Sequence, residues 1–407
     1  MKTIGIIAEF NPFHNGHRHL IEQARAAHTD ATIVVVMSGN FVQRGEPSIF
    51  DKWTRTEAAL KNGADLVLEL PLPFATANAE TFARGAMRVL GESEIIDCLY
   101  FGSESGDLEA LQMGAELLLD ETEEFQLTLK KYLDQGNSFP KARSMALEAV
   151  SNLTTDVFKN PNDILGLEYL MALQKYKYPI IPFTIPRFGE GHHSTTLTEG
   201  HASATAIRRG LFQNDMSALK QTPDNCRKLY RKAILDGKAP VSLETFYYPL
   251  QYILRCTTEE DIKKIFEVTE GLENRIIRAV EHGESIAELI DYIKSKRYTQ
   301  AKIRRILLHI LLRIESHYVT ELMERPTLPY LRVLGFRRAE QRLLGDLIAA
   351  ALPPVITNLS KAKDLLDDDG MKLLNMECIA TDLYTMAYHD KKVRQVNQDY
   401  TIPLVII

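Results

Sequence analysis

The 407-residue sequence predicts an α/β protein with a parallel sheet, followed by a mostly α-helical C-terminal domain. Three observations predict this fold. In the first half, short apolar runs alternate with amphipathic segments, which is typical of βαβ units. These runs are continuously apolar, as expected for strands that are covered on both faces. After about residue 219, helical patterns follow one another, and strand patterns are absent almost to the C-terminus.

The elements can be assigned in chain order from these patterns. Strands are predicted at 3–8, 31–37, 65–70, 96–101 and 179–185. Helices are predicted between them at 18–27, 51–62, 80–90 and 108–119, and residues 121–168 are expected to be mostly helical. Helices of the second half are predicted at 224–235, 258–268, 276–282, 285–295, 301–315 and 338–350. The apolar tail 401–407 is predicted to form a strand.

Composition and charge exclude several classes of protein. Apolar residues make up 45% of the chain and charged residues 25%, which indicates an ordinary globular protein. The net charge of −6 excludes a basic surface over the whole chain, so a polyanionic partner would need a local basic patch. The four cysteines form no CxxC pair, which argues against a zinc ribbon or an iron–sulfur cluster. We expect no membrane span, no secretory signal and a cytoplasmic location.

The loop after the first predicted strand is the most informative segment. Residues 10–17 lie between that strand and a helix. In an open parallel sheet, ligands bind beyond the carboxyl ends of strands, where helix N-termini favour phosphate. Gly16 allows close backbone approach, and His14 and His17 can point the same way to donate hydrogen bonds to a departing pyrophosphate. A capped turn with surface histidines is the plainer alternative. A zinc site from His14, His17 and His19 is another, although no HExxH motif or cysteine supports it.

This segment resembles the HxGH signature of the nucleotidyltransferase superfamily, relatives of class I aminoacyl-tRNA synthetases. The resemblance implies a Rossmann-like nucleotidyltransferase (HUP-type) sheet and a second signature, similar to ISxTxIR, after the last strand. Residues 202–208 read ASATAIR, with alanine in place of the first isoleucine. Ser203 suits a helix N-cap, and Arg208 would then clamp phosphate from that helix.

Further segments resemble the bacterial tRNA(Met) cytidine acetate ligase family over essentially the whole chain. They are MSGNFVQRGEP at 37–47, FGSE at 101–104, KNPNDILG at 159–166, and Pro186-Arg187. The resemblance implies activation of acetate by ATP with release of pyrophosphate, and acetylation of N4 of the wobble cytidine in elongator tRNA(Met). The change of sequence pattern places a domain boundary near 215–240, so we expect an ATP-binding catalytic domain at 1–220 and a helical domain at 221–407 that binds tRNA. It also implies ATP contacts for Gly102, Asn162 and Arg187.

These arguments give a set of candidate site residues. An acetyl-adenylate would form first, with phosphate charge neutralised by His14, His17, Arg208 and Lys52. The nucleotide would contact Ser203, Thr205 and the loop Ile7, Ala8, Glu9, Phe10, Asn11, Pro12, Phe13, His14, Asn15, Gly16, His17, Arg18, His19 and Leu20. Candidates for a general base toward the cytidine amine are Glu9, Asn40 and Asp163. Mg²⁺ is compatible with an ATP reaction, but we identify no dedicated carboxylate cluster, no metal ligands and no protein partner.

A local basic region in the second half is the candidate RNA-binding surface. Residues 294–313 contain seven lysines and arginines and no acidic residue, and Tyr298 can stack on a base. The candidate RNA-binding residues are Lys296, Arg297, Tyr298, Arg304 and Arg305. A second basic stretch contains Arg332, Arg337, Arg338 and Arg342, around Tyr330 and Phe336. The plainer alternative for the first region is the solvated face of an amphipathic helix.

Two other functions fit part of this pattern. A small-molecule nucleotidyltransferase, such as a cytidylyltransferase or a pantothenate-synthetase-like ligase, would share both phosphate motifs but would not need the large helical half. A non-catalytic RNA-binding protein on a degenerate nucleotide fold would not need both motifs intact. The absence of a KMSKS-like lysine pair argues against an aminoacyl-tRNA synthetase.

Overall fold

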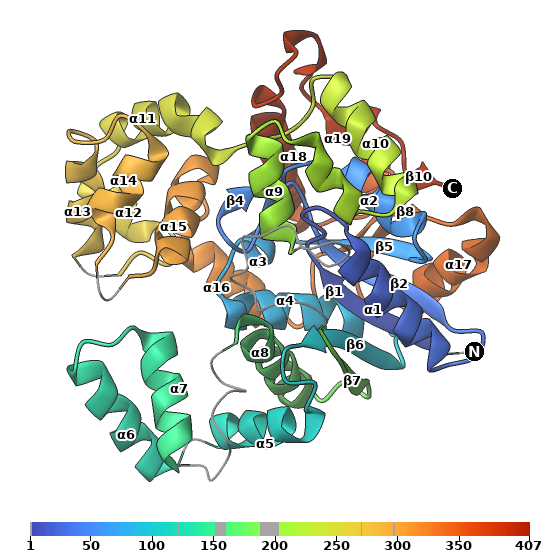
Figure 1. The fold of residues 1–407 in the computed structure, drawn as a ribbon, viewed down its shortest axis with the longest axis horizontal. Coiled ribbons are helices and arrows are strands. Elements are labelled where there is room, and N and C mark those ends of the chain that lie inside the picture. The colour runs from blue at the N-terminus through green and yellow to red at the C-terminus, as the bar shows by residue number, and fades with distance from the viewer. Residues whose placement is uncertain (1, 121, 151–159, 188–202, 270, 296–297) are drawn as a thin grey trace.

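A twisted, mostly parallel sheet forms the centre of the molecule (Figure 1). The computed structural model describes residues 2–120, 122–150, 160–187, 203–269, 271–295 and 298–407. Five strands come from the first half: β1 (Thr3–Ala8), β2 (Thr32–Ser38), β5 (Leu66–Leu70), β6 (Cys98–Ser103) and β7 (Ile181–Pro186). They lie in the order β5-β2-β1-β6-β7 and pair in parallel. The predicted α/β fold with a parallel sheet is therefore confirmed.

Helices cover both faces of this sheet. Alternate residues of β2 enter separate cores: Val34 and Val36 face α4 and α8, whereas Ile33 and Val35 face α1, α2 and α10. The helices of the first half are α1 (Asn15–Ala26), α2 (Lys52–Leu60), α3 (Leu72–Ala75), α4 (Ala79–Gly91), α5 (Leu108–Leu119), α6 (Glu123–Asp134), α7 (Phe139–Val150), α8 (Pro161–Tyr176) and α9 (Ala204–Phe212). A short hairpin of β3 (Phe41–Val42) and β4 (Glu46–Pro47) follows β2. None of the helices in the described part of the chain is long and apolar enough to cross a membrane.

A helical unit stands beside the sheet, in yellow and orange at the left of Figure 1. Its hydrophobic core also takes in Phe41 and Leu72 of the first half and residues near the end of α18 (Asp368–Met386). Its helices are α11 (Tyr247–Cys256), α12 (Glu259–Lys264), α13 (Leu272–Ala279), α14 (Ile286–Ile293), α15 (Gln300–Leu312) and α16 (Ser316–Glu324). The remaining helices are α10 (Asp224–Leu235), α17 (Gln341–Ala350), α18 (Asp368–Met386) and α19 (Gln398–Thr401). Short 3₁₀ turns lie at Met216–Gln221, Leu243–Phe246, Arg338–Glu340, Leu359–Asp364 and Lys391–Val393.

The sheet continues into the second half of the chain, where the sequence analysis expected helices almost to the end. Strand β8 (Leu331–Phe336) is buried throughout and pairs antiparallel with β5, while β9 (Val355–Ile356) and β10 (Val405–Ile406) pair in parallel with β8. The tail strand is thus two residues long rather than seven, because α19 ends at Thr401. The division into domains at residue 220 stays a prediction.

Candidate functional site

The loop between β1 and α1 carries the paired histidines. Its path is set by core packing, since the buried rings of Phe10 and Phe13 lie 4.8 Å apart between centroids. The Tyr230 hydroxyl accepts a hydrogen bond from the Phe13 N–H at 3.0 Å and donates to the Phe13 carbonyl at 3.3 Å. Helix α1 begins at Asn15, three residues earlier than predicted, because His14 acts as its N-cap. Both histidines are therefore held at the start of the helix.

The imidazoles of His14 and His17 stack with ring centroids 3.8 Å apart. The Nδ1 of His14 accepts the Gly16 N–H at 3.0 Å, and the Nδ1 of His17 accepts the His14 N–H at 3.2 Å. A neutral imidazole has one accepting and one donating nitrogen. Because both Nδ1 atoms accept backbone protons, both neutral rings carry their proton on Nε2. Each histidine thus offers one Nε2–H donor.

Both rings are neutral at physiological pH. Burial, together with the positive charges of Arg187 and Arg208, lowers the pKa of His14 to about 3. Burial also holds the pKa of His17 well below its usual value, and His14 and Arg187 lower it further. The histidines can therefore donate hydrogen bonds to an anion without carrying charge, and the positive charge of the site comes from arginines.

Helix α9 brings one of these arginines to the histidines. Ser203 caps the helix as predicted, since its hydroxyl accepts the Ala206 N–H at 3.2 Å. The Arg208 guanidinium donates to the Asn11 carbonyl at 2.8 Å and to the Thr205 hydroxyl at 3.3 Å. Burial lowers the pKa of Arg208 from its usual value. These bonds to uncharged groups anchor the guanidinium to the β1 loop.

The ends of β6 and β7 supply the opposite side of the site. Gly102 belongs to β6, and Arg187 directly follows β7. A Cβ on Gly102 would lie 3.2 Å from Arg187 Cγ, so the arginine side chain packs over this glycine. Asn162 lies in the first turn of α8, where its backbone N–H and side-chain amide bond to Glu104. Residues from β6, from α8 and from the segment after β7 thus line the same cleft as His14 and His17.

These residues line one cleft at the carboxyl edge of the sheet, with an empty volume of about 1090 Å³ that includes space open to solvent. The polar and charged lining groups are Glu9, Asn11, His14, His17, Gln43, Arg44, Asn162, Arg187, Ser203, Thr205 and Arg208. The apolar lining comes from Ile7, Ala8, Phe10, Leu20, Phe82, Phe101, Pro161, Leu165, Tyr169 and Ala204, beside Gly102. A cleft with flat apolar surface and several cations suits a nucleotide with a phosphate chain.

Comparisons with known proteins agree with this geometry. The sequence model of the family described as "HIGH Nucleotidyl Transferase" matches residues 1–399. The tRNA(Met) cytidine acetate ligase of Caldanaerobacter subterraneus subsp. tengcongensis is 41% identical over 408 residues, covering all of both chains. The ligase of Halothermothrix orenii is 38% identical over 421 residues, covering 100% of this chain and 99% of the relative. The chain belongs to the tRNA(Met) cytidine acetate ligase family.

Solved structures of this family have the same fold. The crystal structure of Thermotoga maritima TmcAL bound with alpha-thio ATP superposes with a TM-score of 0.93, at 32% identity and full coverage of both chains. The apo form of the same enzyme superposes with a TM-score of 0.95, also at 32% identity and full coverage of both chains. The predicted nucleotidyltransferase-like fold and the predicted family are therefore confirmed.

Most of the predicted nucleotide-contacting residues meet at the cleft. The structure brings together His14, His17, Arg208, Gly102, Asn162, Arg187, Ser203, Thr205 and six residues of the 7–20 loop: Ile7, Ala8, Glu9, Phe10, Asn11 and Leu20. The other predicted loop residues, Pro12, Phe13, Asn15, Gly16, Arg18 and His19, do not line the cleft. Phe13 and Gly16 instead support the loop, through Tyr230 and His14 respectively.

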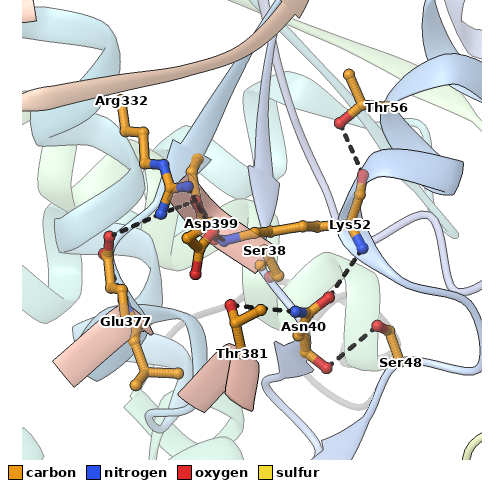
Figure 2. A network of polar contacts seen from close by, with 12 residues as sticks. Ser38, Asn40, Ser48, Lys52, Thr56, Arg332, Glu377, Thr381 and Asp399 are labelled. Carbon is orange, nitrogen blue, oxygen red and sulfur yellow. Dashed lines mark hydrogen bonds and ion pairs between the residues drawn. The ribbon is translucent and has the colours of Figure 1, made fainter. Parts of the chain in front are cut away.

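Lys52 does not reach the cleft, in contrast to the prediction. Its ammonium is 2.9 Å from Glu69 and 2.7 Å from Asp399, and its side chain is only 1% exposed. Arg332 joins the same carboxylates and lies 3.7 Å from Glu377. Figure 2 shows Lys52 and Arg332 converging on Asp399. We call these five residues the ion cluster. The sequence placed Lys52 correctly at the start of α2, but it could not show that carboxylates of β5 and α19 pair with this lysine.

The candidate RNA-binding residues differ in their exposure and in their contacts. Lys296 and Arg297 lie outside the described residues. Arg304 is partly exposed and pairs with Glu46 at 2.7 Å, whereas Arg305 is mostly buried and pairs with Glu267 at 2.7 Å. Tyr298 accepts a hydrogen bond from the Thr269 hydroxyl, and Lys302 lies 5.0 Å from its ring centroid. Arg305 is thus committed to a buried ion pair, and Arg304 and Tyr298 remain the accessible candidates.

The second basic stretch is divided between the sheet and the surface. Arg332 belongs to the ion cluster, and Tyr330 is 1% exposed, with its hydroxyl donating to Glu377 at 2.8 Å. Arg337 pairs with the buried Asp65 at 3.1 Å. The apolar residues around Arg332 form β8, whereas Arg338 and Arg342 lie beyond this strand and are exposed.

Sequence reasoning missed Arg55, which holds together the backbone segments that follow β1 and β2. It lies in α2, is fully buried, and donates hydrogen bonds to the carbonyls of Phe50, Glu9, Ser38 and Gly39. It also missed Gln43 and Arg44, which the β3–β4 hairpin brings to the cleft, and Glu104, which accepts a hydrogen bond from the cleft residue Asn162. The segment at 37–47, which resembles the family pattern, contains both hairpin residues. This resemblance was the sequence signal that could have identified them as cleft residues.

The three candidates for a general base are separated by the structure. Glu9 lines the cleft and accepts the Gln43 N–H at 2.9 Å. Asn40 accepts the Lys52 N–H and bonds to Thr381 beside the ion cluster, and the buried Asp163 accepts from Ser105. Among the described residues, no group of three or more histidine, cysteine or acidic side chains is placed to hold a metal ion.

Proposed function

We propose that this protein is an ATP-dependent acetate ligase that forms N4-acetylcytidine at the wobble position of elongator tRNA(Met), in the cytoplasm. The single observation that carries the proposal is the convergence of two Nε2–H donors and a buried arginine on one cleft at the carboxyl end of β1. The names of the relatives supply the identity of the RNA and of the acyl group.

The first step is formation of acetyl-adenylate. An oxygen of acetate attacks the α-phosphorus of ATP, and the bond to the pyrophosphate oxygen breaks. The leaving pyrophosphate gains negative charge, which His14 and His17 stabilise through their Nε2–H groups and Arg208 through its positive charge. Because Arg208 is anchored to Asn11, it is already in place before the nucleotide binds.

The second step transfers the acetyl group. The N4 amine of cytidine attacks the acetyl carbonyl carbon, AMP leaves, and one N4 proton is lost. Of the three candidate bases, Glu9 is the one at the cleft, and we assign this proton to it. Glu9 is also the one carboxylate among the described lining residues, so a Mg²⁺ ion would be held mainly by the phosphates of ATP.

RNA would reach the cleft from the side of α15. Gly45 in the β3–β4 hairpin packs so closely on α15 that a Cβ at this position would lie 2.3 Å from the backbone nitrogen of Arg305. The same hairpin contributes Gln43 and Arg44 to the cleft, and Arg304 pairs with its Glu46. The accessible face of α15 is thus continuous with the proposed reaction site, which supports Arg304, and Tyr298 just before this helix, as RNA contacts.

The test is incorporation of labelled acetate into tRNA. Purified protein is incubated with ATP, labelled acetate and elongator tRNA(Met), and acid-precipitable label is counted. We expect label to depend on both ATP and tRNA, and pyrophosphate and AMP to accumulate. Label transferred only from acetyl-CoA would overturn the proposal. Pyrophosphate release with a small-molecule acceptor and no RNA would instead identify a small-molecule ligase, and RNA retention without nucleotide turnover a binding protein.

A further inference from the structure

The N-terminus of α8 is capped by a carboxylate from another loop. The N-cap residue, Asn160, makes no side-chain cap of its own. Instead, Glu104, one residue after β6, accepts the N–H groups of Asn162 and Asp163 at 3.0 and 2.9 Å through its Oε2 atom. In return, Asp163 accepts the N–H and the hydroxyl of Ser105 at 3.1 and 2.8 Å. The β6 loop and the first turn of α8 thus hold each other in one arrangement.

Glu104 also determines how the Asn162 amide is turned. The Nδ2 atom of Asn162 donates to Glu104 Oε1 at 2.5 Å. An ionised carboxylate can only accept hydrogen bonds, so the amide must present its NH₂ group to Glu104. The carbonyl oxygen Oδ1 is on the other branch of the amide and faces away from Glu104. Since Asn162 lines the cleft, its Oδ1 is the amide atom left to meet a ligand.

The surroundings of Asn162 suit a base rather than a phosphate. Leu165 follows it by three residues and so lies on the same face of α8, and both residues line the cleft with the neighbouring Phe101 and Tyr169. The histidines and Arg208 come from the β1 loop and α9, on other elements. A flat purine ring would bury apolar surface at the α8 side, and its exocyclic amine would supply the donor that Oδ1 needs.

We propose that Glu104 is a positioning residue that makes the site selective for a 6-aminopurine, by fixing the Asn162 amide with its oxygen toward the base. This inference rests on the proposed function, because it takes the bound nucleotide to be ATP. A 6-oxopurine such as that of ITP would place its own carbonyl oxygen where the amine belongs. Two acceptors would then face each other without a proton between them, which disfavours ITP.

The decisive variant is Glu104→Gln. Its carbonyl oxygen can still accept the two backbone N–H groups of α8, so the cap is kept. Its NH₂ group then faces Asn162, which must turn its own oxygen toward the glutamine and its NH₂ toward the cleft. We expect the wild type to bind ATP about tenfold more tightly than ITP, and the variant to lose or reverse this preference. Glu109→Gln, at an exposed glutamate in α5, is the matched control and should keep the wild-type ratio.

The readout is the ratio of dissociation constants for ATP and ITP, measured by titration, together with thermal unfolding. The inference is supported if Glu104→Gln changes this ratio in the wild-type protein but not in an Asn162→Ala background. The second comparison sets the double variant Glu104→Gln/Asn162→Ala against Asn162→Ala alone. Equal weakening of both nucleotides, or an unchanged ratio, overturns it and reduces Glu104 to a structural cap. Failure of the proposed function is distinguishable, because the wild-type protein itself would then show no ATP-dependent acetylation of tRNA.

Discussion

The cleft and the ion cluster both gather charged side chains beside the same sheet, but they balance charge in different ways. In the ion cluster, Lys52 and Arg332 are matched by three carboxylates within the protein. In the cleft, Arg208 is anchored by a carbonyl and a hydroxyl, and the two histidines are neutral. In the ion cluster, which joins the two halves of the chain, the cations are thus neutralised by carboxylates of the protein. In the cleft, the positive charge of Arg208 is available to a polyanionic ligand.

The two regions also differ in the direction in which the surroundings shift the pKa values of their side chains. Although burial alone would raise it, Arg332 and Lys52 hold the pKa of Asp399 below its usual value, so this carboxylate stays charged. Burial and the neighbouring Glu69 raise the pKa of Glu377 to about 7. In the cleft, burial lowers the pKa of both histidines. Within the ion cluster, Asp399 is therefore kept ionised by its cationic partners, whereas burial keeps the cleft histidines neutral.

The largest expected effect comes from breaking the ion cluster. Lys52→Met leaves Glu69 and Asp399 buried with Arg332 as their one cationic partner in the cluster, so the free energy of unfolding should fall by about 3–5 kcal/mol. Urea denaturation measures this loss. Lys61→Met is the control, because the Lys61–Glu57 pair is partly exposed and should contribute at most about 1 kcal/mol. Similar small losses in both variants would mean that the cluster is not a structural element.

The next largest effect should distinguish the role of the Nε2–H donor of His17 from that of its Nδ1 acceptor. His17→Asn can still accept the His14 N–H but lacks a donor at the Nε2 position, whereas His17→Gln can place an amide NH₂ there. We expect the asparagine variant to lower adenylate formation about 10²–10³-fold and the glutamine variant to recover part of this loss. ATP–pyrophosphate exchange measures both. Equal losses, or a parallel loss of tRNA binding, would show that His17 acts through the fold.

Acid sensitivity provides a third test. The pKa of His14 is about 3 in the folded state and about 6.5 when unfolded. Between these values the unfolded state binds a proton that the folded state does not, so His14 makes stability fall as pH decreases from 6.5. The slope from this residue is at most about 1.4 kcal/mol per pH unit. His14→Asn should flatten the decline of the unfolding free energy between pH 6.5 and 4; an unchanged curve would contradict the assignment.

The smallest expected effect distinguishes the two arginines of α15. Arg304→Gln should weaken tRNA binding by about 1 kcal/mol and reduce its salt slope by about one, without loss of stability. Arg305→Gln should instead destabilise the fold, because Glu267 would remain buried without its partner. Filter binding at several salt concentrations and urea denaturation measure the two effects. If both variants weakened binding equally at unchanged stability, the RNA surface would include Arg305.

How far the sequence predicted the site depended on whether the residues lie close in the chain. The β1 loop, the cap at Ser203 and the strands of the first half follow local rules of periodicity and capping, and the structure places them as predicted. Lys52 was predicted to neutralise phosphate and Arg332 to belong to a basic stretch, because their carboxylate partners Asp399 and Glu377 lie far away in sequence. Strand β8 was missed for the same reason, since Arg332 interrupts its apolar pattern and finds its partners only in the folded chain.

Arg55 has a consequence for the thermodynamics of ligand capture. Its guanidinium holds carbonyls at the end of β1, at the end of β2 and just before α2 in fixed relative positions. Backbone segments that are already immobilised lose little conformational entropy when a nucleotide arrives, so more of the contact energy appears as affinity. Relaxing these segments through Arg55→Leu would make association enthalpically similar but entropically less favourable, a difference that calorimetry on the intact protein can resolve.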